Sequence, residues 1–123
     1  MRRLPLELKA FIKLGEQAFA ACHQAMFVGG LGVAASGNIG ENAAVFEPVH
    51  GSAPPLVGTG KANPIATFLA ASMMLDYLNE KESAEQLRKA IESCIASKET
   101  TPDLDGNLTT NEVTKRVITR IQN

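Results

Sequence analysis

Val45-Phe46-Glu47-Pro48-Val49-His50-Gly51-Ser52-Ala53-Pro54 carries more information about the fold than any other stretch of this 123-residue chain. Its first residues belong to a short apolar run, bounded by turn formers, that predicts a buried strand at 43–47. An acid, a histidine and a Gly-Ser-Ala turn then lead into a loop rich in glycine and proline. Gly51 allows backbone amides to approach a ligand closely, Ser52 adds a hydroxyl, and His50 offers a flat ring with two nitrogens. Taken one at a time, these residues also have ordinary structural explanations.

Helices are predicted on the C-terminal side of this loop. Asn63 has a side chain suited to an N-cap and Pro64 has a φ already set for a first turn, so a helix is expected at 65–78. That segment is apolar on nearly every side, Tyr77 included, which predicts burial inside a larger body. The Asn63 amide is also able to face the edge of a nucleotide base.

Capping-box spacing predicts two further helices. Ser83 and Gln86 precede the apolar stripe of one helix, and Thr109 and Glu112 precede the stripe of the last. The stripes consist of Leu87, Ile91, Cys94 and Ile95, and of Val113, Val117 and Ile121. Their spacing of three and four residues is typical of one buried helix face.

The segment before the quoted stretch is less regular. Apolar residues at helical spacing predict a divergent helix within residues 1–27, and the glycines of 29–32 end it. The small residues of 33–40 predict irregular backbone that approaches another group closely. Residues 28–123 are predicted to form one α/β domain that is helix-rich, with one or two short strands.

Composition excludes several classes of protein. The net charge is -1 and no run of like charges occurs, so nucleic-acid binding is not predicted. No apolar run reaches the roughly 18 residues of a membrane span. Cys22 and Cys94 form no CxxC pair, so we expect neither a disulfide framework nor a zinc site. The expected location is therefore a reducing compartment such as the cytoplasm. The basic residues Arg2 and Arg3 leave the mitochondrial matrix as the alternative location.

Segments on both sides of the quoted stretch complete a larger pattern. They are Gly29-Gly30-Leu31-Gly32, Asn38-Ile39-Gly40, Ala62-Asn63-Pro64, Ser72-Met73-Met74-Leu75, Thr101-Pro102-Asp103-Leu104 and Thr109-Thr110. Together with the quoted stretch they resemble the C-terminal portion of the isocitrate/isopropylmalate dehydrogenase family. The downstream segments look like the tail of NAD-type isocitrate and homoisocitrate dehydrogenases. The resemblance implies the C-terminal part of that family's α/β fold.

The resemblance also implies a site for the adenosine part of NAD, built without a GxGxxG turn. In the family the matching loop surrounds the adenine and its ribose. The positions that carry over as cofactor-binding are Glu47, His50, Gly51, Ser52, Ala53 and Asn63. Glu47 falls on the nicotinamide side of the cofactor.

Two departures from the family pattern weaken these implications. NAD-dependent members usually follow the His-Gly-Ser-Ala-Pro string with an acid that binds the ribose, and NADP-dependent members tend to place a base and an aromatic residue there. Pro55 and Leu56 provide neither, so weak binding is expected and the choice of cofactor stays open. The family's two metal-binding acids fall on Ala18 and Cys22, so we expect that an Mg2+ or Mn2+ site is not retained. No catalytic residue is assigned.

These observations predict a truncated or degenerate isocitrate dehydrogenase-like protein. The family reaction is the NAD-dependent oxidative decarboxylation of a 2-hydroxy acid, and this chain alone is expected to show no turnover and at most weak adenosine binding. The alternative is an interaction protein that pairs with itself or with a full-length homologue, because the apolar helix at 65–78 needs burial. A homo-oligomer or a hetero-assembly is expected in either case.

Overall fold

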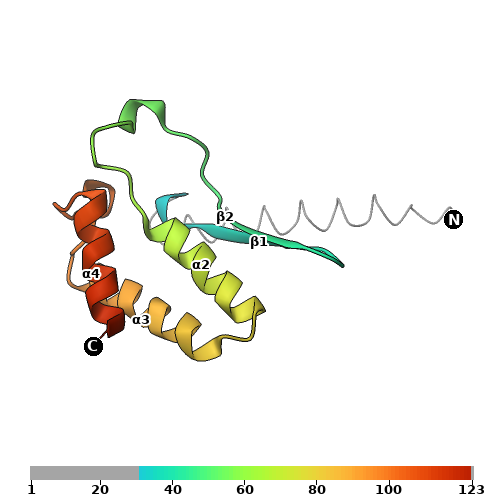
Figure 1. Ribbon diagram of the computed structural model, residues 1–123. Helices are drawn as coiled ribbons and strands as arrows, with labels where there is room; N and C mark the ends of the chain where they lie inside the picture. Colours follow the sequence, from blue (N-terminus) through green and yellow to red (C-terminus); the bar gives the residue numbers. More distant parts are fainter. Residues whose placement is uncertain (1–30, 123) are drawn as a thin grey trace, which may run out of the picture.

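The computed structural model describes residues 31–122 (Figure 1). Its elements are η1 Leu31–Val33, β1 Ala35–Ile39, β2 Ala44–Pro48, η2 Pro54–Leu56, α2 Ile65–Tyr77, α3 Lys81–Ala96, η3 Pro102–Leu104 and α4 Thr110–Gln122. The predicted fold class, helix-rich with short strands, is confirmed. The predicted helix within 1–27, including Ala18 and Cys22, lies outside the described residues.

Strands β1 and β2 form an antiparallel hairpin that lies along α2 (Figure 1). Gly37 pairs with Phe46, and a Cβ on Gly37 would lie 2.9 Å from the Phe46 ring. The glycine therefore leaves room for this ring, which packs against Tyr77 of α2 with 5.6 Å between ring centroids. The absence of a side chain at position 37 lets the hairpin lie close to α2.

The hairpin corrects two predictions. Residues 35–39 were predicted to be irregular, yet they form β1, because β2 supplies hydrogen-bond partners that the small side chains do not reveal. The strand predicted as buried is half-exposed, with Val45 at 56% and Glu47 also facing outward. A two-stranded sheet covered by one helix buries only one face. Successive residues of β2 therefore alternate between half-buried and exposed positions.

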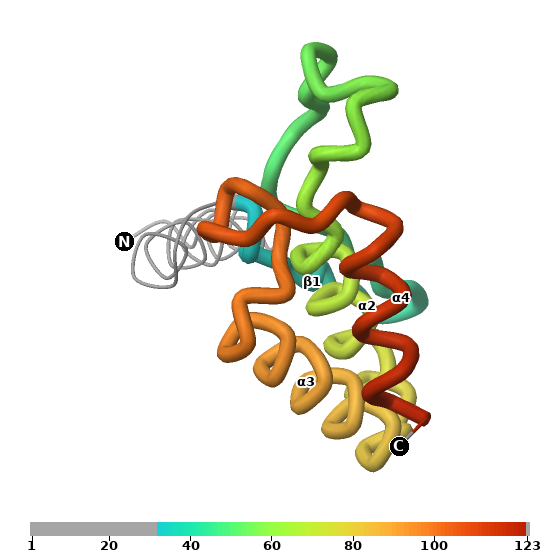
Figure 2. Tube along the Cα trace, turned by 90° about the vertical axis from the view of Figure 1, so that its left-hand side faces the viewer, coloured from blue at the N-terminus to red at the C-terminus, as the bar shows by residue number. Residues whose placement is uncertain are grey.

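Helices α2, α3 and α4 enclose the core of the described part of the chain (Figure 2). The buried core residues are Val33, Ile65, Leu87, Ala90, Ile91, Cys94 and Val117. They include most of the predicted stripe of α3, because side chains three and four apart share one face of a helix. Ile95, at the edge of that stripe, is 40% exposed.

Helix α2 is less buried than its composition predicts. Its face toward α3 is covered, but Met74, Tyr77 and the following Leu78 are 42%, 46% and 56% exposed. The prediction that Tyr77 belongs to the core is wrong for the described residues. Among residues 31–122, the hairpin and α3 cover two sides of α2 and leave this apolar end of the helix exposed.

One predicted capping box is present and the other is absent. Helix α4 begins after Thr109, whose backbone N–H donates to the Glu112 carboxylate at 2.8 Å, while the Glu112 N–H donates to the Thr109 hydroxyl at 3.3 Å. Helix α3 begins at Lys81, ahead of Ser83, and no side chain caps it. Asn79 has φ 64°, which turns the chain sharply after α2 and starts α3 earlier than the predicted box would allow.

Acid is expected to destabilise this fold through two carboxylates. The Arg88 hydrogen bond holds the pKa of Asp76 below its ordinary 3.8, and the Thr109 backbone N–H holds the pKa of Glu112 below its ordinary 4.5. Since both folded-state pKa values are lowered, the stabilisation is present above the unfolded values and is lost as pH falls through the folded ones. The urea midpoint should therefore fall between about pH 5 and about pH 3, and less so in Glu112→Gln. The exposed Glu82 of α3 supplies the matched control Glu82→Gln, and an equal pH dependence in both variants would contradict the role of Glu112.

Candidate functional site

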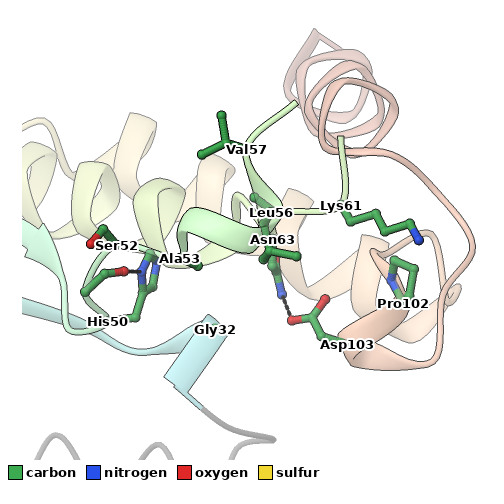
Figure 3. Close-up of a pocket in the computed structure, with 12 residues that line it drawn as sticks. Gly32, His50, Ser52, Ala53, Leu56, Val57, Lys61, Asn63, Pro102 and Asp103 are labelled. Carbon is green, nitrogen blue, oxygen red and sulfur yellow. Dashed lines mark hydrogen bonds between the residues drawn. The ribbon is translucent and has the colours of Figure 1, made fainter. Parts of the chain in front are cut away.

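The loop between β2 and α2 encloses a pocket against the segment around η3 (Figure 3). The pocket has a volume of about 580 Å³. It is lined by Gly32, His50, Gly51, Ser52, Ala53, Leu56, Val57, Lys61, Ala62, Asn63, Pro102 and Asp103. Figures 1 and 2 show the loop standing away from the helices, and residues 50–62 are all exposed.

Five of the six predicted cofactor-binding residues line this one pocket: His50, Gly51, Ser52, Ala53 and Asn63. Glu47 is not among the lining residues, because it lies on the exposed face of β2. The structure therefore brings together the positions expected at adenosine and leaves apart the position expected near the nicotinamide.

The pocket wall is mainly apolar, with a few polar groups. Leu56 and Val57, on and after η2, are 39% and 82% exposed. The Nδ1 of His50 lies 3.0 Å from the Gly51 carbonyl oxygen, which can only accept a hydrogen bond, so Nδ1 donates. In the neutral ring this leaves Nε2 as an acceptor. A flat ring and two aliphatic side chains offer a surface on which a base can stack.

Asn63 fixes the end of the loop. Its carbonyl oxygen accepts a hydrogen bond from the Ile65 N–H at 2.9 Å, so the side chain does cap α2, although Pro64 holds the N-cap position itself. Its amide nitrogen donates to Asp103 Oδ2 at 2.9 Å. The predicted capping role is thus confirmed. One N–H of the amide remains for the edge of a base, so that role stays a prediction.

Asp103 is the lining residue that the sequence analysis overlooked. Its carboxylate is held by Asn63 and by the Thr101 hydroxyl, which donates to Oδ1 at 2.5 Å. Thr101 is fully buried, and the 3-10 turn η3 starts beside it. A Cβ on Gly32 would lie 2.9 Å from Asp103 Oδ2, so glycine there leaves room for the carboxylate.

The N-terminus of α4 is hydrogen-bonded to the end of the loop that precedes α2. The Thr110 N–H donates to the Gly60 carbonyl at 2.8 Å, and the Thr110 hydroxyl donates to the Ala62 carbonyl at 2.6 Å. Gly60 has φ 68°, a conformation that favours glycine. Residues far apart in the sequence thus hold the loop around the pocket.

No metal site is apparent among residues 31–122. Within that range no three His, Cys, Asp or Glu side chains gather so that they could hold an ion. The predicted loss of metal ligands at Ala18 and Cys22 falls outside it and stays a prediction.

None of the helices within residues 31–122 is long and apolar enough to cross a bilayer.

Comparison with known proteins shows the family of the chain. The family model of isocitrate/isopropylmalate dehydrogenase matches residues 22–117. The chain belongs to the isocitrate/isopropylmalate dehydrogenase family. Isocitrate/homoisocitrate dehydrogenase of Thermus thermophilus is 56% identical over 91 residues, which cover 74% of this chain and 27% of that protein. The probable isocitrate dehydrogenase [NAD] subunit alpha of Caenorhabditis elegans, described as mitochondrial, is 49% identical over 96 residues.

Solved structures of this family share the fold. The crystal structure of isocitrate dehydrogenase from Methylococcus capsulatus aligns with a TM-score of 0.79 and 36% identity, covering 86% of this chain and 32% of that one. The apo β-decarboxylating dehydrogenase of Thermococcus kodakarensis aligns with a TM-score of 0.74 and 40% identity. The chain thus spans little more than a quarter of the curated relatives, which the 27% coverage of the Thermus protein illustrates.

Proposed function

We propose that the pocket between residues 50–63 and 102–103 binds the adenosine part of NAD. The observation that carries the proposal is the convergence of five predicted cofactor residues on one pocket in a chain of this family. The apolar wall and the His50 ring suit a stacked base, and the loop backbone around Gly51 suits close approach. The proposal concerns adenosine alone, since Glu47 lies outside the pocket.

Binding by this chain alone is expected to be weak. The loop residues from His50 to Ala62 are exposed, so a ligand gains little burial there. Pro55 is not among the lining residues and contributes no acceptor to a ribose. A dissociation constant on the order of millimolar is expected for NAD, and a similar one for AMP.

Titration by NMR or calorimetry tests this proposal with NAD, AMP and nicotinamide mononucleotide. AMP and NAD should bind with similar weak affinities and nicotinamide mononucleotide should not bind, because only adenosine has a site. His50→Ala should weaken AMP binding by about tenfold through the loss of one stacking face. Gln86→Ala, on the exposed surface of α3, is the matched control. Tight binding of the nicotinamide half, or full affinity for AMP in His50→Ala, would exclude the proposed site.

A second candidate function is assembly with a second copy of the chain or with a full-length relative. The observation that favours it is the C-terminal end of α2, where Met74, Tyr77 and the following Leu78 lie within five residues and are all exposed. Exposed apolar side chains gathered at one end of a helix favour an interaction surface. The compartment proposed for either function is the cytoplasm, with the mitochondrial matrix as the alternative.

Light scattering tests assembly directly. The mass of the wild-type chain should rise with concentration, and Tyr77→Glu should lower the association constant by at least about tenfold, because burying a charge in an apolar contact is costly. Glu80→Gln, an exposed change just beyond this face, is the control. A wild-type chain that stays monomeric over a wide range of concentrations would contradict the assembly function.

A further inference from the structure

We infer that the free edge of β1 pairs in antiparallel fashion with β1 of a second copy of this chain, so that two hairpins form one four-stranded sheet. The inference deepens the proposed assembly function and rests on it. It names the partner as a second copy and the contact as a strand edge. The sheet of the described residues has two strands, β1 and β2. A sheet of that size gains stability from any further strand that extends it.

The backbone hydrogen bonds at both ends of the hairpin establish which groups face outward. The Gly40 N–H donates to the Ala43 carbonyl at 2.9 Å, and the Val49 N–H donates to the Ala34 carbonyl at 3.0 Å. Opposite residues of an antiparallel pair alternate between bonded and non-bonded positions, so the even-numbered residues of β1 are the bonded ones. The residues that turn their N–H and C=O away from β2 are therefore Ala35, Gly37 and Ile39. No other strand within residues 31–122 pairs with this edge.

The outer edge of β2 is protected against pairing, and that of β1 is not. Pro48 has no N–H to donate, and the exposed Glu47 places a charge on β2. Strand β1 contains neither a charged residue nor a proline. An edge without these features is a template for pairing with another strand.

The free edge is complementary to itself. A twofold axis at Gly37 places Gly37 opposite Gly37 of the second copy, and Ala35 opposite Ile39. The outward N–H and C=O groups then meet along the whole strand and form about six hydrogen bonds. In the same register Ser36 lies opposite Asn38 of the second copy, so two uncharged polar side chains meet and no like charges do. This match in backbone pattern and charge favours a second copy as the occupant of the edge.

Both copies of α2 fit on one face of the resulting sheet. A Cβ on Gly37 would lie 2.9 Å from the Phe46 ring and 3.5 Å from Met73 of α2, so Gly37 and Ile39 point to the face that α2 covers. Strands spaced about 4.8 Å apart put the two β2 strands roughly 14 Å apart, and helices pack at about 8–10 Å. The tip of the hairpin extends past α2 (Figure 1), which leaves Ile39 63% exposed and available to the second copy.

The contact is expected to be weak. It pairs five residues of each copy, whereas a standard stable interface buries about 1,600 Å² in total. A dissociation constant on the order of 100 µM is therefore expected for wild type. Association of this strength is visible in concentration series that span the micromolar and millimolar ranges.

Amide hydrogen exchange of the wild-type chain, followed by NMR, tests the contact without any substitution. Exchange of the Gly37 and Ile39 N–H groups should slow by about threefold or more between about 0.02 mM and about 1 mM protein, because dimerisation gives these groups partners. Exchange of the Asn38 N–H should change much less, since that position is already bonded to β2. Equal behaviour of the three amides would overturn the edge contact.

Two pairs of variants test the register. Ser36→Lys/Asn38→Asp places opposite charges across the two copies, and Ser36→Lys/Asn38→Lys places like charges there. The first should associate at least about tenfold more tightly than the second, as measured by light scattering. The matched controls Ser36→Lys/Asn42→Asp and Ser36→Lys/Asn42→Lys make the same charge change at Asn42, an exposed residue of the hairpin turn outside β1. These two controls should associate equally.

The outcomes separate this inference from the assembly function on which it rests. A wild-type chain that stays monomeric up to about 1 mM would overturn both. Self-association that responds to Tyr77→Glu, but equally in both charge pairs at position 38, would overturn the β1 contact and leave assembly through the end of α2. Slowed exchange at Gly37 and Ile39 together with the ordered affinities of the charge variants is the result expected for the shared sheet.

Discussion

Replacing Gly106 with alanine is expected to lower the free energy of unfolding by about 3 kcal/mol or more. A Cβ at this position would lie 1.9 Å from the Thr100 carbonyl oxygen and 2.5 Å from its hydroxyl. Backbone cannot yield as a flexible side chain does, so the turn from Thr100 to Leu108 must open. That turn is closed by hydrogen bonds from the Leu108 N–H to the Thr100 carbonyl at 3.0 Å and from the Gly106 N–H to the Thr101 carbonyl at 3.2 Å.

Thermal unfolding measures this effect, and a fall in Tm of more than about 10 °C is expected for a domain of this size. Gly51→Ala is the matched control, since a Cβ there meets nothing within 4 Å. Because Asp103 lines the pocket and belongs to the turn that must open, any folded Gly106→Ala protein should also lose AMP binding. A Tm equal to that of Gly51→Ala would show that the turn is not needed for stability.

Turnover by the purified chain is expected to fall below that of an intact family member by more than about ten-thousandfold. The family resemblance predicts that the metal-binding acids correspond to Ala18 and Cys22, and neither side chain is a suitable ligand for Mg2+. General acid–base catalysis and metal assistance each contribute large factors to reactions of this kind. If the chain lacks both, the proposed adenosine site alone is not expected to promote hydride transfer.

The measurement is NADH formation with isocitrate, homoisocitrate or isopropylmalate in the presence of Mn2+. A trace of an intact family enzyme added to the same assay sets the detection limit, and a preparation from host cells without the gene sets the background. Activity that elutes with the 13.1 kDa chain would contradict the expectation and imply ligands that the alignment at Ala18 and Cys22 does not identify.

Local signals in the sequence were good predictors where the interaction itself is local. The Thr109–Glu112 capping box is confirmed because donor and acceptor lie three residues apart. The same spacing at Ser83 and Gln86 predicted the wrong start for α3. The helix begins at Lys81, because the chain has already turned at Asn79. A capping motif specifies a helix start only when the preceding backbone arrives in the right direction.

Non-local contacts were beyond the sequence. Strand β1 was missed because its small residues become a strand only through pairing with β2. The loop from His50 to Asn63 was found because a continuous motif marks it. Asp103 was seen in its own motif but received no role, because nothing along the chain reveals that it meets Asn63.

The two segments that form the pocket, residues 50–63 and the segment around Asp103, are synthesised at different times. The ribosome completes residues 50–63 before it reaches Asp103 and Thr110, which close the pocket through Asn63, Gly60 and Ala62. At ordinary rates of translation, the loop waits on the order of seconds for these partners. During that interval α2 exposes apolar surface that α3 later covers. The pocket is therefore complete only after residues 103–110 have been synthesised and have packed against the loop.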